Sequence, residues 1–281
     1  MSKKYKNPKQ DITNDFFTNE EKLKMIFKEL SFEWTEKQKR VVNVAQNPNT
    51  KLIILDGLPG TGKTLLSMEI MLKGLNQERY DDIKCIRSTM QAKDGRMGDL
   101  PGDKDEKMLY LAGPFYDKLN KLLEPETIME LKKKKLFEVL PTSSLRSYSW
   151  SSGILASEAQ CMTFDSLVTI TTRTEENSLI VIEGDSLLQN DIGSMSGFRK
   201  FKNMIAQPHF KSAGAYVFEF GVDDIMRSGL TQMIAREVLF MKEKGSEERE
   251  KERENKSIIK PVSGSYLADG ENDWQPKRKT V

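Results

Sequence analysis

At 281 residues the chain has room for one large domain or two small ones. Its 37% hydrophobic and 31% charged residues are typical of a soluble globular protein, and no apolar run approaches the length of a membrane span. The single histidine, His209, excludes multi-histidine metal sites, and a net charge of +2 excludes a global basic field, so we expect a cytoplasmic protein whose chemistry depends on carboxylates, lysine, arginine and bound metal.

The N-terminal part of the chain is predicted to contain two helices. Residues 1–14 are polar and expected to be frayed, and apolar residues at helical spacing predict a first helix from Asn14 to Leu30. A second helix is expected to begin at Thr35, because Thr35-x-x-Gln38 matches a capping box.

A phosphate-binding loop is the strongest motif in the sequence. The pattern G-x-x-x-x-G-K-[ST] lies between the apolar run from Leu52 to Leu55 and a helical stretch from Leu65 to Leu75. Its glycines let backbone N–H groups turn inward to hold phosphate at the start of the helix. Lys63 is expected to reach the β- and γ-phosphates, and the Thr64 hydroxyl is expected to ligate Mg²⁺. The predicted nucleotide-binding residues are Gln38, Gly57, Leu58, Pro59, Gly60, Thr61, Gly62, Lys63, Thr64 and Leu65.

Gln38 has two interpretations. It closes a helix start in the capping box, and a glutamine shortly before a phosphate loop often hydrogen-bonds the adenine of a nucleotide. The sequence leaves both open, and one side chain could do both.

Strands alternate with helices after the loop. The predicted strands are Ile83 to Arg87, Leu136 to Leu140, Gly153 to Ala156, Ser178 to Glu183 and Ala215 to Phe220. The predicted helices are one ending near Leu123, then Glu126 to Lys134, Thr163 to Thr172, Gly197 to Ile205 and Val222 to about Lys242. Continuous apolar strands between helices indicate an α/β domain with a doubly wound parallel sheet and helices on both faces. We divide the chain into a polar N-terminal segment and helix (1–34), this domain (35–243) and a charged tail (244–281) that is expected to be a fraying helix end or disordered.

Two basic clusters have alternative interpretations. The run from Lys132 to Lys135 and the cluster from Trp274 to Lys279 are either solvated surface or contacts for nucleic acid. Cys85 and Cys161 lie in apolar surroundings and are predicted to be buried thiols.

Phosphoryl transfer also needs a carboxylate close to the metal and a group that orients the attacking water. Glu183 and Asp185 follow one apolar strand, and Glu158 follows another. Hydrophobicity alone favours the strand that ends at Glu183 as the metal-site strand. The residues themselves leave the choice between these two strand ends open.

Short stretches in a shared order from Thr35 to about Ala235 resemble the PhoH-like proteins, P-loop ATPases of bacteria and phages related to the motor core of superfamily 1 helicases. The matching stretches, besides the phosphate loop, are Thr35-Glu36-Lys37-Gln38-Lys39, Leu100-Pro101-Gly102-Asp103 with Glu106-Lys107, Tyr116-Asp117, Glu138-Val139-Leu140-Pro141 with Arg146, Glu158-Ala159-Gln160, Thr172-Arg173, Glu176-Asn177-Ser178, Gly184-Asp185 with Gln189 and Asp191, and Asp223-Asp224-Ile225 with Arg227-Ser228-Gly229. The resemblance implies a RecA-like P-loop NTPase fold and a bacterial or phage-infected host cell.

The resemblance also implies roles for individual residues. Glu158 stands where the family has the glutamate of Asp-Glu-Ala-Gln, which polarises the attacking water. Gln189 is similar to the γ-phosphate sensor of related motors. Arg227 resembles a charge-stabilising arginine, which would act as an arginine finger if a neighbouring subunit supplied it, and its alternative is a surface ion pair.

The chain departs from the family pattern at Ser157. The family has an aspartate there that holds Mg²⁺, and serine keeps a hydrogen bond but loses the negative charge. We therefore expect weaker metal binding, with Thr64 and Asp185 as the metal-site residues. Nucleotide binding is better supported than fast hydrolysis.

These patterns predict an ATP- and Mg²⁺-dependent motor domain that acts on RNA or single-stranded DNA. A helicase normally needs two such domains, so we expect a homo-oligomer, and some PhoH-like proteins form hexamers. The alternative function is a nucleotide-dependent switch with weakened hydrolysis that acts through a protein partner. A small-molecule kinase is disfavoured, because no arginine-rich lid stands out in the sequence.

Overall fold

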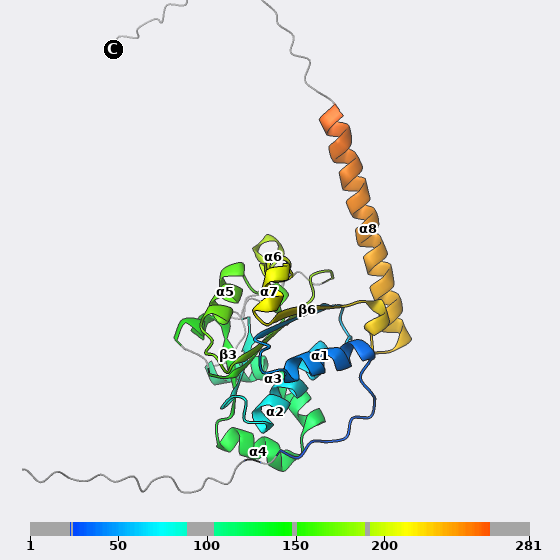
Figure 1. The fold of residues 1–281 in the computed structure, drawn as a ribbon. Coiled ribbons are helices and arrows are strands. Elements are labelled where there is room, and N and C mark those ends of the chain that lie inside the picture. Colours follow the sequence, from blue (N-terminus) through cyan, green and yellow to red (C-terminus); the bar gives the residue numbers. More distant parts are fainter. Residues whose placement is uncertain (1–22, 24, 89–103, 148–150, 189–191, 259–281) are drawn as a thin grey trace, which may run out of the picture. The chain divides into compact units, whose positions relative to one another are not determined.

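A six-stranded parallel sheet forms the centre of the fold (Figure 1) in the computed structural model, which describes residue 23 and residues 25–88, 104–147, 151–188 and 192–258. The strand order is β3-β2-β4-β5-β1-β6, and each neighbouring pair is parallel. The strands are β1 (Leu52–Gly57), β2 (Ile83–Arg87), β3 (Phe137–Pro141), β4 (Gly153–Ser157), β5 (Leu179–Gly184) and β6 (Ala215–Phe220). The sheet confirms the predicted α/β class.

Helices cover both faces of this sheet (Figure 1). One face carries α1 (Glu36–Gln46), α2 (Lys63–Asn76), α3 (Lys104–Leu122) and α4 (Pro125–Lys133). The other carries α5 (Phe164–Thr172), α6 (Phe198–Ile205) and α7 (Pro208–Ser212). These elements belong to the first of two compact units, residues 1–236, and α8 (Gly229–Ile258) continues into the second unit, residues 237–281.

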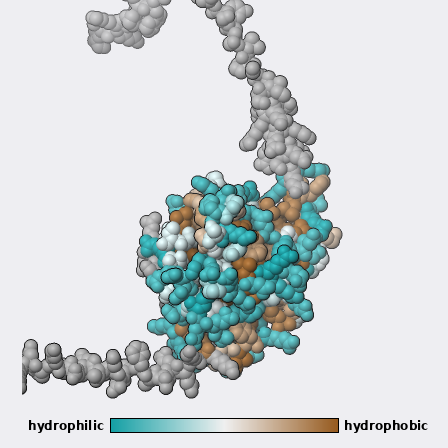
Figure 2. Space-filling view, in the orientation of Figure 1, coloured by the Kyte–Doolittle hydropathy of each residue, from teal (hydrophilic) through white to brown (hydrophobic). Residues whose placement is uncertain are grey.

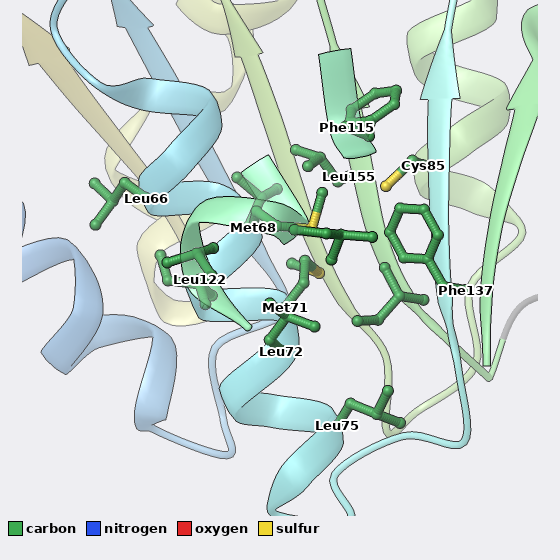
Figure 3. Packing of buried hydrophobic residues seen from close by; sticks show 14 of the residues in the cluster. Leu66, Met68, Met71, Leu72, Leu75, Cys85, Phe115, Leu122, Phe137 and Leu155 are labelled. Atoms are coloured by element: carbon green, nitrogen blue, oxygen red, sulfur yellow. The ribbon is translucent and has the colours of Figure 1, made fainter. Parts of the chain in front are cut away.

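Each face has its own hydrophobic core. Alternate residues of β1 serve the two cores, with Ile53 and Leu55 on the α2 side and Leu52 and Ile54 on the other. Figure 3 shows how α2 packs against α3 and the sheet. The labelled side chains of this core are Leu66, Met68, Met71, Leu72, Leu75, Cys85, Phe115, Leu122, Phe137 and Leu155. This burial on both faces explains why the central strands β1, β4 and β5 are largely apolar.

The predicted helix from Asn14 to Leu30 is wrong where the structure describes it. Residues 25–30 are not helical, and Phe27 forms an antiparallel bridge with Leu123. The backbone N–H of Lys28 donates to the Leu122 carbonyl at 2.8 Å. Apolar side chains at 23, 25 and 27 alternate with a period of two, and they pack against the core in an extended chain. The rest of this prediction lies outside the described residues.

The predicted helix from Val222 to about Lys242 also differs. Residues Val222–Asp224 form a short 3-10 turn, and α8 begins only at Gly229. Between them the N–H of Met226 donates to the Gly60 carbonyl at 3.0 Å, so this segment is held against the phosphate loop instead of continuing as helix. Helix α8 then continues past residue 244 to Ile258. The division between domain and tail at residue 243 stays a prediction. Within the described residues, no helix is both long and apolar enough to span a membrane.

Candidate nucleotide-binding site

The phosphate loop connects β1 to α2. Gly60 and Gly62 have φ values of +88° and +77°, a region that side chains rarely adopt. At Gly57 the constraint is space, because an added Cβ would lie 2.7 Å from Phe220 Cβ. Gly62 is the N-cap residue of α2 and provides no side-chain cap. The first-turn N–H groups of α2 therefore form an anion site with no protein side chain capping it.

Lys63 is the cation of this loop. Its Nζ donates to the carbonyl oxygens of Gly57 at 2.7 Å and Leu58 at 3.0 Å. Burial lowers the pKa of the Lys63 amine, and the nearby carboxylates, chiefly Glu183 and Asp185, oppose this shift. The Lys63 amine thus contacts two backbone carbonyl groups of the loop, and a bound phosphate could replace these carbonyl groups as its hydrogen-bond acceptor.

A cavity of about 540 Å³ opens over the loop. It lies at the carboxyl ends of the strands, which is the general binding position in open α/β sheets. The cavity is lined by the loop, by the ends of β2, β4 and β5, by α3, and by the segments before α1 and before α8. Its lining residues are Phe32, Trp34, Pro59, Gly60, Gly62, Lys63, Thr64, Leu65, Arg87, Pro114, Lys118, Lys121, Ser157, Glu158, Glu183, Gly184, Asp185, Met226 and Arg227.

Glu158 follows β4 and lines this cavity. Its φ is +57°, in the left-handed region, which is unusual for a residue other than glycine and is often found at functional sites. Its Oε2 accepts a hydrogen bond from Gln160 Nε2 at 2.6 Å, and Gln160 Oε1 accepts from the backbone N–H of Asp185 at 3.1 Å. Gln160 therefore connects Glu158 to the end of β5.

Glu183, near the end of β5, lies beside the loop. It is buried, and its Oε1 accepts from Ser157 Oγ at 2.7 Å while Oε2 accepts from Ser67 Oγ at 3.3 Å. Burial raises the pKa of the Glu183 carboxyl, although hydrogen bonds from Ser157 and Thr64 and the charge of Lys63 act in the opposite direction.

Asp185 lies just past β5 and also lines the cavity. Its Oδ1 accepts from the backbone N–H groups of Leu187 and Leu188, both at 2.8 Å. Its Oδ2 is buried and has no hydrogen-bond partner among the residues that the structure describes. The metal-binding role of Asp185 stays a prediction, and Oδ2 is the carboxylate oxygen that could bind the metal.

Three other predicted residues differ in how they relate to the cavity. Gln38 forms the capping box of α1 with Thr35, and its Nε2 donates to the Thr61 carbonyl at 3.0 Å, so the structural interpretation is confirmed while the adenine contact stays a prediction. Arg227 is exposed and packs over Gly60, and it forms no ion pair with any residue in the described part of the chain. Gln189 lies outside the described residues.

Several lining residues were not predicted. Lys118 and Lys121 extend from α3, Arg87 ends β2, and Phe32 and Trp34 lie edge-to-face with ring centroids 5.0 Å apart. Burial, followed by repulsion from Lys121, lowers the pKa of the Lys118 amine. The three- and four-residue spacing of Pro114, Lys118 and Lys121 places them on one face of a helix, and this signal could have been read in the sequence.

The basic run in α4 lies away from this cavity. Residues 132–135 directly precede β3, so they lie at the edge of the sheet where strands begin, opposite the carboxyl ends that carry the cavity. Lys132 Nζ lies 4.1 Å from the centre of the Tyr116 ring. The run therefore does not contribute to the nucleotide site.

The fold and this loop define a nucleotide-binding P-loop domain with a RecA-like sheet, in which β5 lies between the loop strand β1 and β4. The sequence model of the PhoH-like protein family matches residues 33–238, and the chain belongs to this family.

Two curated proteins that carry the family's name are similar to this chain. The PhoH-like protein of Synechocystis sp. is 28% identical over 202 residues, which are 71% of this chain and 60% of that protein. The PhoH-like protein of Mycobacterium leprae is 31% identical over 203 residues, 71% of this chain and 56% of that protein. The chain thus spans between half and two thirds of the length of these relatives. The solved structure of Pif1 helicase from Candida albicans aligns with 68% of this chain and 40% of its own, at 13% identity and a TM-score of 0.34.

Proposed function

We propose that this chain hydrolyses ATP and acts as a motor domain on RNA or single-stranded DNA. The observation that supports hydrolysis is that one cavity is lined both by a phosphate loop with its lysine and by Glu158. Those are the two halves that phosphoryl transfer to water requires.

In this proposal the residues of the chain divide the chemistry among them. The loop N–H groups and Lys63 bind the phosphates, and Glu158 orients the attacking water and accepts its proton. Arg87, Lys118 and Arg227 line the same cavity and would stabilise the negative charge that spreads over the transferred phosphoryl group. A bound Mg²⁺ would supply further neutralisation of the phosphate charge. The uncapped start of α2 and the unpartnered oxygen of Asp185 fit an anionic nucleotide and its cation.

The base of the nucleotide is expected near Phe32 and Trp34. Both aromatic rings line the cavity, and an added Cβ on Gly62 would lie 3.3 Å from Trp34 Cζ3, so this indole lies directly against the loop. Aromatic rings offer stacking to any base. Binding of ATP should therefore change the fluorescence of Trp34.

The proposal includes self-association. Arg227 lines its own cavity, but it is also exposed and forms no ion pair within the described residues, so a neighbouring copy could reach it. The first turns of α8 expose Leu230, Met233 and Ile234, and hydrophobic residues are visible around the base of this helix (Figure 2). Exposed apolar side chains at helical spacing are typical of a contact surface.

The test is phosphate release with Mg–ATP, measured alone and with RNA or single-stranded DNA. We expect measurable release that nucleic acid stimulates. If phosphate release is present but neither nucleic acid changes it, the motor function is wrong and the ATPase remains. If ATP binds without any turnover, hydrolysis is wrong.

The second candidate, a nucleotide-dependent switch, is favoured by Ser157. The family's metal-binding aspartate is absent there, so hydrolysis could be slow enough for the bound nucleotide to act as a long-lived signal. ATP binding with no turnover, together with turnover gained when a carboxylate is returned to position 157, would favour this function.

A further inference from the structure

The buried carboxylate of Glu183 lies next to Ser157, the position at which this chain lacks the family's aspartate. β4 and β5 are parallel neighbours with Ala156 paired to Ile182, so Ser157 and Glu183 are the next residues in register. Ser157 Oγ donates to one oxygen of Glu183 at 2.7 Å, and Ser67 Oγ from α2 donates to the other at 3.3 Å. The carboxylate is thus held from two sides beside the phosphate loop.

This carboxylate has no ion pair within the described part of the chain. Glu183 is 2% exposed, and the nearby Lys63 amine instead donates to two loop carbonyl groups. The Lys63 charge acts on Glu183 through space alone, and a buried carboxylate without a direct cationic partner is costly, so proteins usually pair such groups with a cation or a metal. The arrangement is therefore incomplete until a cation enters the cavity.

A second carboxylate supports the same ligand independently. Asp185 is also 2% exposed and lines the cavity, and its Oδ2 has no hydrogen-bond partner among the described residues. Buried polar atoms without a partner are rare in native proteins. A divalent cation close to Glu183 would give both side chains a direct cationic partner, in addition to the through-space charge of Lys63.

The chemistry of the surrounding groups fits Mg²⁺. This ion prefers oxygen ligands and is usually bound by one or two carboxylates together with substrate phosphates. Thr64, the loop residue whose hydroxyl is a metal ligand in P-loop proteins, lies close enough to Glu183 to lower the pKa of its carboxyl group. Glutamate is one methylene longer than aspartate, and it reaches the Ser157 hydroxyl from the neighbouring strand.

We propose that Glu183 replaces the missing aspartate of position 157 as the carboxylate that binds the Mg²⁺ of a Mg–nucleotide complex, and that Ser157 positions it. This inference rests on the proposed nucleotide-binding function, and it removes the reason to regard Ser157 as a sign of a decayed site.

If Glu183 binds the metal, returning an aspartate to position 157 alone should not raise the Mg²⁺ affinity. In Ser157→Asp two carboxylates would lie within hydrogen-bond distance of each other, where the serine now donates to Glu183. Like charges in a buried site repel, so this variant should gain no Mg²⁺ affinity. The double variant Ser157→Asp with Glu183→Gln returns a single carboxylate and should bind Mg²⁺ as the wild type does.

The test uses Mn²⁺ as a paramagnetic probe and requires no turnover. Electron paramagnetic resonance of free Mn²⁺ gives its affinity for the full-length protein with saturating ADP, and ADP affinity is measured separately in EDTA. The variants are Glu183→Gln, Asp185→Asn, the double variant, and Glu138→Gln as a control. Glu138 is a β3 residue that pairs with Lys84 at 2.7 Å and does not line the cavity.

We expect Glu183→Gln to lose about tenfold or more in Mn²⁺ affinity while its ADP affinity in EDTA is unchanged. The control should match the wild type. Full Mn²⁺ affinity in Glu183→Gln, or a loss confined to Asp185→Asn, would overturn the inference while leaving nucleotide binding intact. Failure of the wild type to bind ADP or ATP would instead overturn the proposed function on which it rests.

Discussion

The carboxylates of the cavity differ in position and environment, and this difference separates their expected roles. Glu158 is half-buried at a left-handed backbone position and hydrogen-bonds to Gln160, whereas Glu183 is fully buried between two serine hydroxyl groups. The first is placed for exchange with water in the cavity, and the second is placed for a fixed cation.

Substitution of Glu158 should separate binding from turnover. Glu158→Gln keeps the size of the side chain and removes its ability to accept a proton, so we expect ATP affinity within about twofold of wild type and turnover reduced about a hundredfold or more. Phosphate release and equilibrium binding are measured on the same preparation, with Glu138→Gln as the control. Turnover equal to that of the wild type would remove Glu158 from the mechanism.

The buried thiols should be inert in the native protein. Cys85 is fully buried, and burial, with the nearby Glu183 charge, raises its pKa well above the usual value. A raised thiol pKa lowers the thiolate fraction, so at pH 8 we expect Cys85 to react with a disulfide reagent only after unfolding. The reaction is followed by absorbance with and without denaturant. Rapid reaction of Cys85 in the native protein would contradict its described burial.

At the level of single residues, the sequence predicts the conformation of the phosphate loop, because the motif constrains the backbone itself, while the binding of phosphate by these residues stays a prediction. Gly60 and Gly62 have the left-handed conformations that the loop requires, and Lys63 lies at the loop carbonyl groups. The link between Ser157 and Glu183 could not be predicted from spacing alone. It depends on the register of two strands that are neighbours in the sheet but 26 residues apart in the chain.

Among the elements, the phosphate loop and α2 depend on each other. Gly62 ends the loop and begins the helix, and an added Cβ would lie 3.3 Å from Trp34 and 3.4 Å from Gln38 and Met226. The loop is thus packed between the segment before α1 and the segment before α8.

We expect Gly62→Ala to be destabilising. The left-handed φ of +77° costs a residue with a side chain about 1–2 kcal/mol, and the crowded Cβ adds to this. Urea unfolding gives the change in free energy. Gly221→Ala is the matched control, because Gly221 has a φ of −95° and no atom within 4 Å of an added Cβ. Equal stability of the two variants would show that the loop does not need glycine at position 62.

Helices and strands with a clear hydrophobic periodicity were predicted to within a few residues, and the exceptions have physical causes. The all-apolar strands needed only their hydrophobic runs, because both faces of the sheet are covered. The apolar side chains of residues 25–30 fit the spacing of a helix as well as that of a strand. The bridge between Phe27 and Leu123 stabilises the extended conformation. The late start of α8 depends on the contact between Met226 and Gly60, which joins residues far apart in the sequence.

On the scale of the whole molecule, the cavity lies at the carboxyl ends of the strands, and the exposed Arg227 is among its lining residues. Exposed apolar side chains follow directly after this arginine in the sequence, on the first turns of α8. A second copy that covers this helix face would lie next to the nucleotide site.

We therefore expect association through this face. Light scattering with and without ATP should give a mass above 32.2 kDa for the wild type. Met233→Glu with Ile234→Lys should shift the mass toward the monomer, because both side chains are more than half exposed and charges there would have to be buried in the contact. The control is Met129→Glu, at a methionine that is 62% exposed on α4. A wild-type monomer under both conditions would contradict the prediction.

For the whole molecule, the sequence predicted the fold class and the family, while nucleic-acid binding and the assembly remain proposals. Lys118 and Lys121 reach the cavity only because α3 packs beside α2 on the same face of the sheet, a placement that no local pattern specifies. The motif predicts where phosphate binds, and the tertiary fold determines which further charges surround it.

The central claim is that this phosphate loop binds ATP through Lys63, and calorimetric titration of ATP into the full-length protein tests it most directly. Charged hydrogen bonds contribute about 1.5–3 kcal/mol, so Lys63→Ala should weaken ATP binding about ten- to a hundredfold. Lys73→Ala, in the same helix but paired with Glu69 at 2.6 Å and outside the cavity, should leave the affinity unchanged. Equal ATP affinity in the wild type and Lys63→Ala would contradict the account.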